Sequence, residues 1–285
     1  MKEKSKIYAE SWNVAWRKCS DKNSILNDKK SPFTFIKNSI RYWAADPFLF
    51  EHNGDIYIFA ELYDYFKRRG VIGFYKLNGK KRGKWISVIS EDYHLSYPYI
   101  FKKDGQIYIM PESNASNSLY LYRAVNFPYE WEKAIAIREN VKLADTTLFD
   151  FNNKEYALSF DVTFPKKPNL MLLDMKEKNN DKILDLENVE LRRPAGKVLP
   201  DNIRPAQNCT SDYGKGIIFY HYSLKDDEYS EEEIQRVFPE DLSYSQEIYL
   251  DGMHTYNRLD KYEVIDVKTR RFNLLNLASR IIGKL

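Results

Sequence analysis

Histidine is scarce in this sequence of 285 residues, and the motifs of several large enzyme classes are missing. The four histidines show no metal-ligand spacing such as His-x-x-x-His, so we predict no metal site. The sequence contains no P-loop, no glycine-rich dinucleotide loop and no Gly-x-Ser-x-Gly elbow. These absences exclude the enzyme classes that the motifs define, and we expect no cofactor.

Strong charge of one sign and long apolar runs are also lacking. A net charge of +3 does not indicate nucleic-acid binding, so we expect no nucleic-acid partner. No apolar stretch approaches the roughly 20 residues of a membrane span. The charged start, Met1 to Lys6, is not followed by the apolar core of a secretory signal. We therefore expect a cytoplasmic protein whose two cysteines, Cys19 and Cys209, are free thiols.

One sequence motif is present three times. Asp46, Tyr97 and Asp145 each stand eleven positions before a tyrosine, and a Gly or Asn stands three positions before that tyrosine. Apolar and aromatic residues flank this turn on both sides, which is the pattern of a β-hairpin. A weaker fourth copy runs from Gln207 to Ile218. Hairpin units that recur about every 50 to 60 residues have the size of one propeller blade.

Further strands are predicted after the hairpins, at residues 71–77, 119–122, 170–173 and 246–250. The segments Ile7–Trp16 and Arg258–Val267 also have strand patterns, and together they would form a fifth blade that pairs the two chain ends. The even repeat has no Pro/Gly/Ser-rich linker, which favours one domain. We therefore predict an all-β fold, a five-bladed β-propeller over residues 1–268.

Residues 269–285 differ from the rest of the chain. Apolar residues such as Phe272, Leu275 and Ile282 share one face, and basic residues mostly avoid it, which predicts a short amphipathic helix. Such a helix has three interpretations: it packs on the side of the propeller, it lies in a membrane interface, or it docks to a partner protein.

The repeat also predicts where chemistry would lie. If the first strand of each hairpin is innermost, the equivalent residues Asp46, Tyr97, Asp145 and Gln207 ring the axis. Carboxylates that face one another across a narrow pocket suit glycosyl chemistry, because one moves a proton and another stabilises positive charge on the sugar. We predict three catalytic residues on this basis: Asp46, Glu112 and Asp145.

A wider set of polar residues clusters around these points, and Arg204 and His254 are suited to bind phosphate, carboxylate or sugar hydroxyls. The alternative is structural, since Asp-Pro at a strand start is ordinary turn chemistry and most of the rings pack between blades. The residues predicted to bind substrate are Glu61, His94, Ser96, Tyr97, Arg204, Gln207, Asn208, His254 and Arg258.

Several stretches resemble the N-terminal domain of plant glucosamine inositolphosphorylceramide transferases, over about residues 40 to 266. They include Ala45-Asp-Pro-Phe-Leu-Phe50, the run from Glu91 through His94 to Tyr99, Met110-Pro-Glu-Ser113, Arg204-Pro-Ala-Gln-Asn-Cys209 and Gly252-Met-His-Thr-Tyr-Asn257. The resemblance implies a role in glycolipid assembly, and bacterial relatives of this domain are associated with surface-polysaccharide synthesis. The plant proteins carry a separate C-terminal glycosyltransferase domain, which we do not find here.

The resemblance also implies a wider kinship with five-bladed propellers of the glycoside hydrolase family 43 type. In those enzymes an early Asp-Pro carries the general base, which Asp46 matches. A second Asp and a Glu complete the site there, and Asp145 and Glu112 are our candidates for them.

Three functions remain open from the sequence. The first is a glycosyltransferase that uses a sugar nucleotide or lipid-linked sugar and a glycan acceptor, at the inner face of the membrane. Arg204 and His254 would then stabilise the phosphate leaving group. The second is a glycoside hydrolase that acts on intracellular oligosaccharides. The third is a non-catalytic sugar-binding propeller that serves a partner glycosyltransferase.

Overall fold

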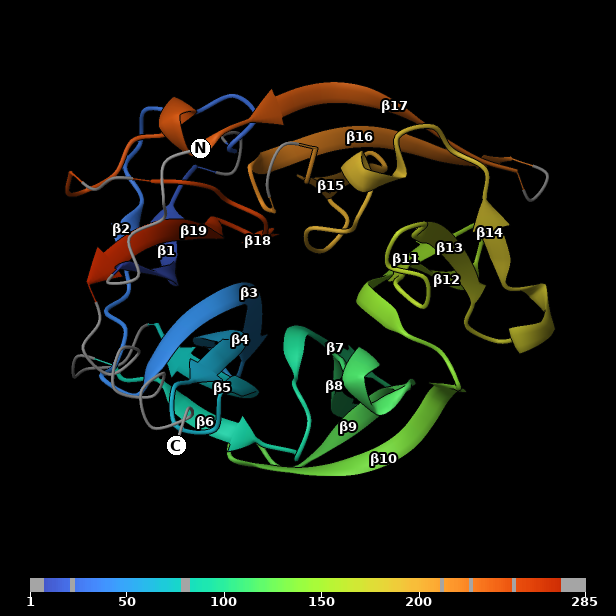
Figure 1. The fold of residues 1–285 in the computed structure, drawn as a ribbon, viewed down its shortest axis with the longest axis horizontal. Helices are drawn as coiled ribbons and strands as arrows, with labels where there is room; N and C mark the ends of the chain where they lie inside the picture. Colours follow the sequence, from blue (N-terminus) through green and yellow to red (C-terminus); the bar gives the residue numbers. More distant parts are fainter. Residues whose placement is uncertain are drawn as a thin grey trace.

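The structure, a computed structural model, describes residues 8–20, 24–77, 83–210, 213–225, 228–247 and 250–272. Five antiparallel sheets stand around a central axis, as the blades of a propeller do (Figure 1). The predicted five-bladed β-propeller is therefore confirmed. In the described part of the chain the only helices are four single turns, none of them long enough to cross a bilayer: η1 (Asn114–Ser116), η2 (Lys178–Asn180), η3 (Val189–Leu191) and η4 (Pro239–Asp241).

Blades I to III each contain four strands that follow one another along the chain, with the first strand of each nearest the axis (Figure 1). Blade I consists of β3 (Tyr42–His52), β4 (Asp55–Asp64), β5 (Arg69–Lys76) and β6 (Ile86–Ile89). Blade II consists of β7 (Ser96–Lys103), β8 (Gln106–Glu112), β9 (Ser118–Asn126) and β10 (Glu130–Glu139). Blade III consists of β11 (Leu143–Phe151), β12 (Lys154–Asp161), β13 (Asn169–Asp174) and β14 (Lys182–Leu184).

Blade IV has three regular strands, β15 (Ile203–Asn208), β16 (Gly216–Lys225) and β17 (Glu228–Val237). An irregular stretch, residues 193–199, lies inside them and takes the innermost place; we call it the inner segment. Single β-bridges join Pro194 to Ala206 and Leu199 to Ile203. In Figure 1 the loop before β15 accordingly lies closest to the axis.

The fourth sequence repeat was placed wrongly. The hairpin turns of blades I and II have left-handed backbones, with φ of 52° at Asn53 and 50° at Asp104. The matching turn of blade IV is Asp201-Asn202, with φ of 60° and 55°. The repeat therefore begins at Arg193-Pro194, seven to eight positions before this turn, and not at Gln207. It escaped notice because Pro194-Ala-Gly-Lys197 lacks the apolar residues that follow Asp46 and Tyr97.

The last strand predicted for blade IV, at residues 246–250, is also wrong. Described residues of that stretch form no strand, and β17 (Glu228–Val237) takes the place instead. This strand carries four glutamates, at positions 228, 231, 232 and 233, and most of its side chains are exposed. An outer strand with one sheet neighbour shows little apolar alternation, so its pattern did not identify it.

Blade V is built from both ends of the chain, as predicted. Its order is β18-β19-β1-β2, with bounds Tyr256–Leu259, Tyr262–Phe272, Tyr8–Lys18 and Thr34–Phe35. The register of β1 against β19 is unbroken from Tyr8–Phe272 to Lys18–Tyr262. The predicted helix of residues 269–285 is wrong at its start, because Thr269–Phe272 end β19, and residues 273–285 lie outside the described residues.

Apolar side chains fill the spaces between neighbouring blades, and this packing fixes how the inner strands face the axis. Between blades I and II, Phe48, Phe59 and Phe74 pack with Tyr97 and Tyr99. Phe48 contacts the Tyr97 ring edge-on, with centroids 4.8 Å apart. Rings of this kind contribute most of the buried apolar area, so most aromatics belong to blade packing.

Candidate active site

A bulge occurs at the same place in the inner strands of blades I, II and III. The ladders shift register at Asp46, Tyr97 and Asp145, where φ is 51°, 44° and 51°. A bulge bends the strand and re-aims a side chain, and a left-handed backbone at a residue other than Gly carries strain that its surroundings must hold. The sequence repeat therefore encodes the same β-bulge in three blades, and this bulge directs these three residues to the axis.

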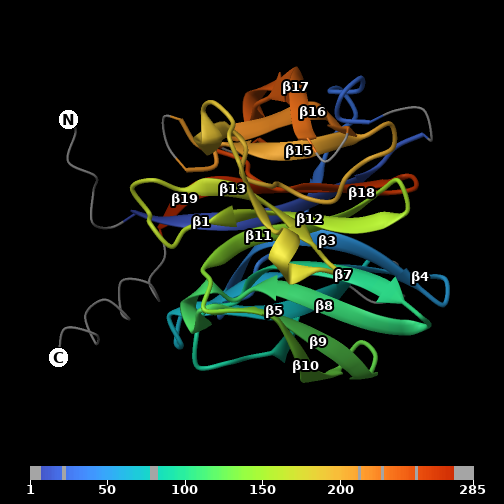
Figure 2. The same cartoon turned by 90° about the vertical axis from the view of Figure 1, so that its right-hand side faces the viewer.

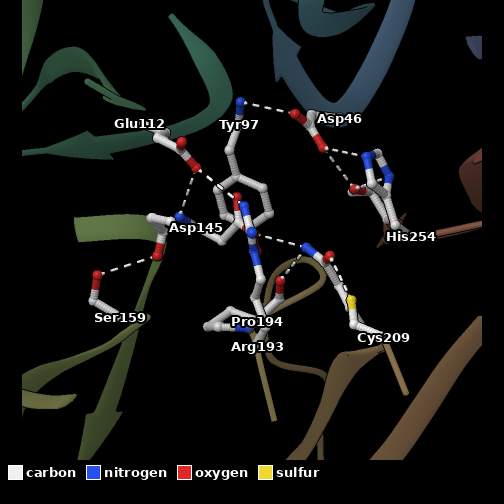
Figure 3. Close-up of polar contacts among 12 residues, drawn as sticks. Asp46, Tyr97, Glu112, Asp145, Ser159, Arg193, Pro194, Cys209 and His254 are labelled. Atoms are coloured by element: carbon white, nitrogen blue, oxygen red, sulfur yellow. Dashed lines mark hydrogen bonds and ion pairs between the residues drawn. The ribbon is translucent and has the colours of Figure 1, made fainter. Parts of the chain in front are cut away.

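Carboxylates hold each bulge from the neighbouring blade (Figure 3). The Tyr97 backbone N–H donates to Asp46 Oδ2 at 3.1 Å, and the Asp145 N–H donates to Glu112 Oε2 at 3.3 Å. The Asp46 N–H donates to Asp266 Oδ2 at 2.9 Å. Three blades thus contribute Asp46, Glu112 and Asp145 to one buried group around the axis, which we call the acid cluster.

Arg193 of the inner segment completes the acid cluster. Its Nε donates to Asp145 Oδ2, and its Nη2 lies 3.4 Å from Glu112 Oε2 (Figure 3). Its side chain is 18% exposed, more than those of Glu112 and Asp145, so it marks the side from which a ligand would arrive. The sequence analysis missed Arg193, although it stands 48 positions after Asp145, the interval that separates Asp145 from Tyr97.

His254 lies on the opposite side of Asp46 from Tyr97 (Figure 3). Its Nδ1 contacts Asp266 Oδ2 at 2.6 Å, and its Nε2 lies 3.7 Å from Asp46 Oδ1. The ring stacks on Trp12, with centroids 3.9 Å apart, and Tyr213 meets it edge-on. The structure therefore brings His254 to the predicted catalytic residues, and it adds Trp12 and Tyr213, which the sequence analysis missed.

The protonation states of the cluster follow from burial and crowding. Burial raises the pKa of Asp46 to about 6, with His254 opposing the rise and Asp145 and Asp266 adding to it. Burial and the neighbouring Asp145 raise the pKa of Glu112 well above its usual range, against the effect of Arg193. Burial alone would lower the pKa of His254, but Asp266 and Asp46 outweigh it, so the net shift is upward. Asp46 is mostly ionised at neutral pH, whereas Glu112 keeps its proton to a higher pH than an ordinary glutamic acid does.

Gln207 reaches the cluster by a different route from the predicted one. It lies on β15, the second strand of its blade counted from the axis, and its Nε2 donates to Asp145 Oδ2 at 2.7 Å. Tyr97 points its hydroxyl at Thr147 Oγ1, 2.8 Å away. Asn208 accepts from the Thr210 hydroxyl at 2.9 Å. Ser96 is buried beside the bulge of blade II.

The two other predicted arginines lie elsewhere. Arg204 is buried against Glu231, with Nε and Nη2 at 2.6 and 2.7 Å from its carboxylate, and it occupies the repeat position of Tyr57, not that of Asp46. Arg258 donates to the Asp260 carbonyl at 2.9 Å, at the turn between β18 and β19. It lines a cavity of about 750 Å³ with Leu199 and Ile203 at the far end of the inner segment. Arg193 therefore replaces Arg204 as the cation nearest the acid cluster.

A metal could be held by three of these residues. Asp46, His254 and Asp266 each offer one ligand atom, and the three atoms lie within 4.8 Å of one another. Those atoms already contact one another and the backbone, as in the hydrogen bonds from the His254 and Thr255 N–H groups to Asp266 Oδ1. The prediction that the protein has no metal site stays a prediction.

Glu61 lies beside the cluster, between blades I and II. It is 5% exposed, and its Oε1 has no hydrogen-bond partner among the described residues. His94 Nε2 is 3.4 Å from this oxygen, and His94 Nδ1 accepts from the Gly70 N–H at 3.0 Å. Burial and the nearby Asp46 and Glu112 carboxylates raise the pKa of Glu61 well above its usual range. Glu61 is therefore a carboxylic acid that resists ionisation at the edge of the acid cluster.

Glu61→Gln is expected to stabilise the protein, and the gain should grow with pH. Near pH 4 the carboxyl is largely protonated in both the folded and the unfolded chain, so ionisation contributes little difference. As pH rises, the unfolded carboxyl ionises while the folded one resists, so the wild type loses stability that the variant keeps. Thermal unfolding between pH 4 and pH 8 measures this, and a gain that is constant with pH would contradict it.

The inner segment depends on Gly196. Its φ is +144°, and a Cβ there would lie 1.9 Å from the Tyr256 carbonyl oxygen. Thr147 Oγ1 donates to the Gly196 carbonyl at 3.2 Å, so the segment is also held from blade III. The close approach leaves no room for a side chain and keeps Arg193 beside Asp145.

Gly196→Ala is expected to destabilise the protein by at least about 2 kcal/mol, because strain and a backbone clash add together. Gly105→Ala is the control: its φ is +78°, but nothing lies within 4 Å of the added Cβ. It should cost only about 1 kcal/mol, the usual penalty of a left-handed residue. Urea unfolding of both variants tests this, and equal losses would show that the clash at Tyr256 is relieved without cost.

The fold and the acid cluster together define a five-bladed β-propeller with a buried carboxylate site on its axis. Two solved structures share the fold. A GH43 β-xylosidase/α-arabinofuranosidase from a compost microbial metagenome, in complex with xylotriose, has a TM-score of 0.54 at 12% identity and covers 82% of this chain and 94% of that one. A GH62 hydrolase in complex with xylotriose has a TM-score of 0.51 at 8% identity and covers 85% and 96%.

The chain belongs to the family described as glucosamine inositolphosphorylceramide transferase 1, N-terminal, whose match covers residues 10–266. It is 29% identical over 277 residues to glucosamine inositolphosphorylceramide transferase 1 of Arabidopsis thaliana, covering 91% of this chain and 35% of the relative. The protein of the same name from Oryza sativa subsp. indica is 28% identical over 207 residues, covering 66% and 27%. The chain thus spans about a third of the length of these relatives.

Proposed function

We propose that this protein catalyses glycosyl transfer in the assembly of a glycolipid or cell-surface glycan, with the acid cluster as its active site. The observation that carries the proposal is the convergence of Asp46, Glu112 and Asp145 from three blades on one buried site that also holds Arg193 and His254. The name of the plant relatives, a transferase that acts on inositolphosphorylceramide, supports the glycolipid class.

The roles follow from protonation and charge. Asp46, with a pKa of about 6, is ionised at neutral pH and accepts the proton of the acceptor hydroxyl. The hydroxyl oxygen then bonds to the anomeric carbon, and the bond from that carbon to the leaving phosphate oxygen breaks. The phosphate keeps the electron pair, and Arg193 and His254 stabilise its negative charge. Arg193 takes the role that the sequence analysis gave to Arg204.

The test is release of nucleoside diphosphate from a panel of sugar nucleotides, with lipid-linked acceptors included. We expect turnover with one donor class and loss of turnover in Asp46→Asn. Turnover that is unchanged in this variant would show that the acid cluster is not the active site. The predicted cytoplasmic location, and attachment to a membrane through residues 273–285, are part of this proposal and are tested by cell fractionation.

A hydrolase or transglycosidase is the second candidate, and one observation favours it. Burial and Asp145 raise the pKa of Glu112 well above its usual range. A diphosphate leaves without a proton, whereas a sugar alkoxide needs one, so a neutral carboxylic acid is more useful for cleaving a glycosidic bond. Release of reducing sugar from aryl glycosides, lost in Glu112→Gln, would select this candidate. A non-catalytic sugar-binding role predicts ligand binding with neither product.

A further inference from the structure

A stacked aromatic pair stands on blade I next to Glu61. Trp43 and Tyr63 face each other across β3 and β4, with ring centroids 4.9 Å apart and an angle of 5° between the rings. Ala45 and Glu61 form the neighbouring pair on the same face of these strands. Both rings are partly exposed, and Tyr65 meets Tyr63 edge-on. The pair therefore forms a wall beside the acid cluster.

Glu61 is the polar group that lies next to this aromatic wall. Its Oε1 is buried without a hydrogen-bond partner among the described residues. A buried polar atom left unpaired costs about 1–3 kcal/mol, so such an atom needs an explanation. A ligand hydroxyl that donates a hydrogen bond to the carboxyl of Glu61 would satisfy this oxygen.

His94 is fixed in one tautomer beside Glu61. Because His94 Nδ1 accepts from the Gly70 N–H, the ring carries its proton on Nε2, which lies 3.4 Å from Glu61 Oε1. Burial lowers the pKa of His94, which keeps the ring neutral. Its side chain is still 39% exposed, so the Nε2–H group is accessible to a ligand.

Gly70 is built into this arrangement. A Cβ at this position would lie 2.3 Å from the Leu95 carbonyl oxygen, 2.6 Å from Glu61 Oε1 and 2.9 Å from His94 Cε1. The glycine therefore lets β5 approach both polar groups. Gly70 also pairs with Tyr63 in the ladder of β4 and β5, so the same strands position the aromatic wall and the polar groups.

We propose that Trp43, Tyr63, Glu61 and His94 form a second subsite, between blades I and II, that holds a six-membered polyhydroxylated ring of the acceptor. The exposed aromatic surface packs against the C–H face of a pyranose or cyclitol. Glu61 and His94 bind two of its hydroxyls. The subsite deepens the proposed function and rests on it for the reaction, but its binding is measurable without turnover.

The experiment measures binding of methyl β-D-glucopyranoside, N-acetylglucosamine and myo-inositol by titration calorimetry and saturation-transfer NMR. We expect one ring class to bind the wild type, and Trp43→Ala and Glu61→Ala to weaken it at least about tenfold. Pyranoside and inositol are separate arms, so the result identifies the ring. Thermal unfolding of both variants separates lost binding from unfolding. Trp43→Phe should retain binding, because it keeps an aromatic ring against the ligand.

The control is Tyr129→Ala, which removes a 56% exposed ring from the turn between β9 and β10, away from the subsite. It should bind as the wild type does. Affinity unchanged in Trp43→Ala and Glu61→Ala, or no binding of any ring at millimolar concentration, overturns the subsite. Binding that depends on Trp43 without nucleoside diphosphate release would leave the subsite standing and reject the transferase. Nucleoside diphosphate release that depends on Asp46, with an acceptor KM that Trp43→Ala does not change, would reject the subsite and support the transferase.

Discussion

Asp46→Asn is expected to lower the rate of glycosyl transfer by about 10²- to 10⁴-fold, the usual contribution of a positioned general base. The substitution keeps the shape of the side chain, and the hydrogen bonds with the Tyr97 N–H and the Thr255 hydroxyl can still form. Only the ability to accept a proton is removed. The wild-type rate should fall as pH drops through about 6, where Asp46 becomes protonated.

The thermal stability of the Asp46→Asn variant should rise, although its activity falls. The pKa of folded Asp46 is raised to about 6 from the ordinary value of 3.8, so folding disfavours its ionised form. The stability linked to this group is present below pH 3.8 and is lost as pH rises through about 6. Asp46→Asn should therefore melt at a higher temperature than the wild type at pH 8, with the gain vanishing near pH 4.

Asp104→Asn is the matched control, because Asp104 is an exposed turn residue with a φ of 50°, which Asn adopts as readily. It should change neither the rate nor the pH dependence of stability. An active Asp46→Asn protein would remove Asp46 from catalysis. An inactive one that melts lower than the wild type at pH 8 would mean that a damaged site, and not a missing base, explains the loss.

Arg193→Ala is expected to destabilise the protein by about 3–5 kcal/mol, the cost of removing one partner from a buried ion pair. The change leaves Asp145 and Glu112 without their cation. Because Arg193 helps to keep the pKa of Glu112 from rising further, the loss should be no smaller at pH 8 than at pH 5. Urea unfolding at the two pH values gives the free energies of unfolding.

Arg123→Ala is the comparison for Arg193→Ala. Arg123 pairs with Glu132, but the two side chains are 50% and 46% exposed, so the loss should stay below about 1 kcal/mol. A second change, Asp145→Asn in the Arg193→Ala background, should recover part of the stability by removing the stranded charge. If Arg193→Ala costs no more than Arg123→Ala, the cluster is not held by this cation.

The repeat made most of the fold predictable. Asp46, Tyr97 and Asp145 recur with their turns, so three blades and the ring closure followed from spacing and periodicity. The inner segment did not, because Pro194-Ala-Gly196 has no apolar alternation. Its place is set by tertiary contacts, such as the Tyr256 carbonyl against Gly196, that no local pattern reports.

The site was predictable in its acids and in His254, but not in its arginine. A bulge that recurs with the repeat directs Asp46 and Asp145 inward, so their positions could be read from the sequence. Arg204 looked suitable by residue type alone, yet it occupies an outward position and pairs with Glu231. The interval of 48 residues, applied once more after Asp145, would have led to Arg193. Glu61 and His94 were predicted as ligands, but the Trp43–Tyr63 pair needed the strand register.

Pairing of β1 with β19 has a consequence for folding of the chain. Tyr8 pairs with Phe272, far away in the sequence, so this ladder cannot form until β19 has been synthesised. Until then β1, which lies beside β19 in the closed fold (Figure 2), offers an unpaired edge. Closure of the toroid therefore waits for β19, and the open chain before that point is the species that needs protection from edge-to-edge pairing.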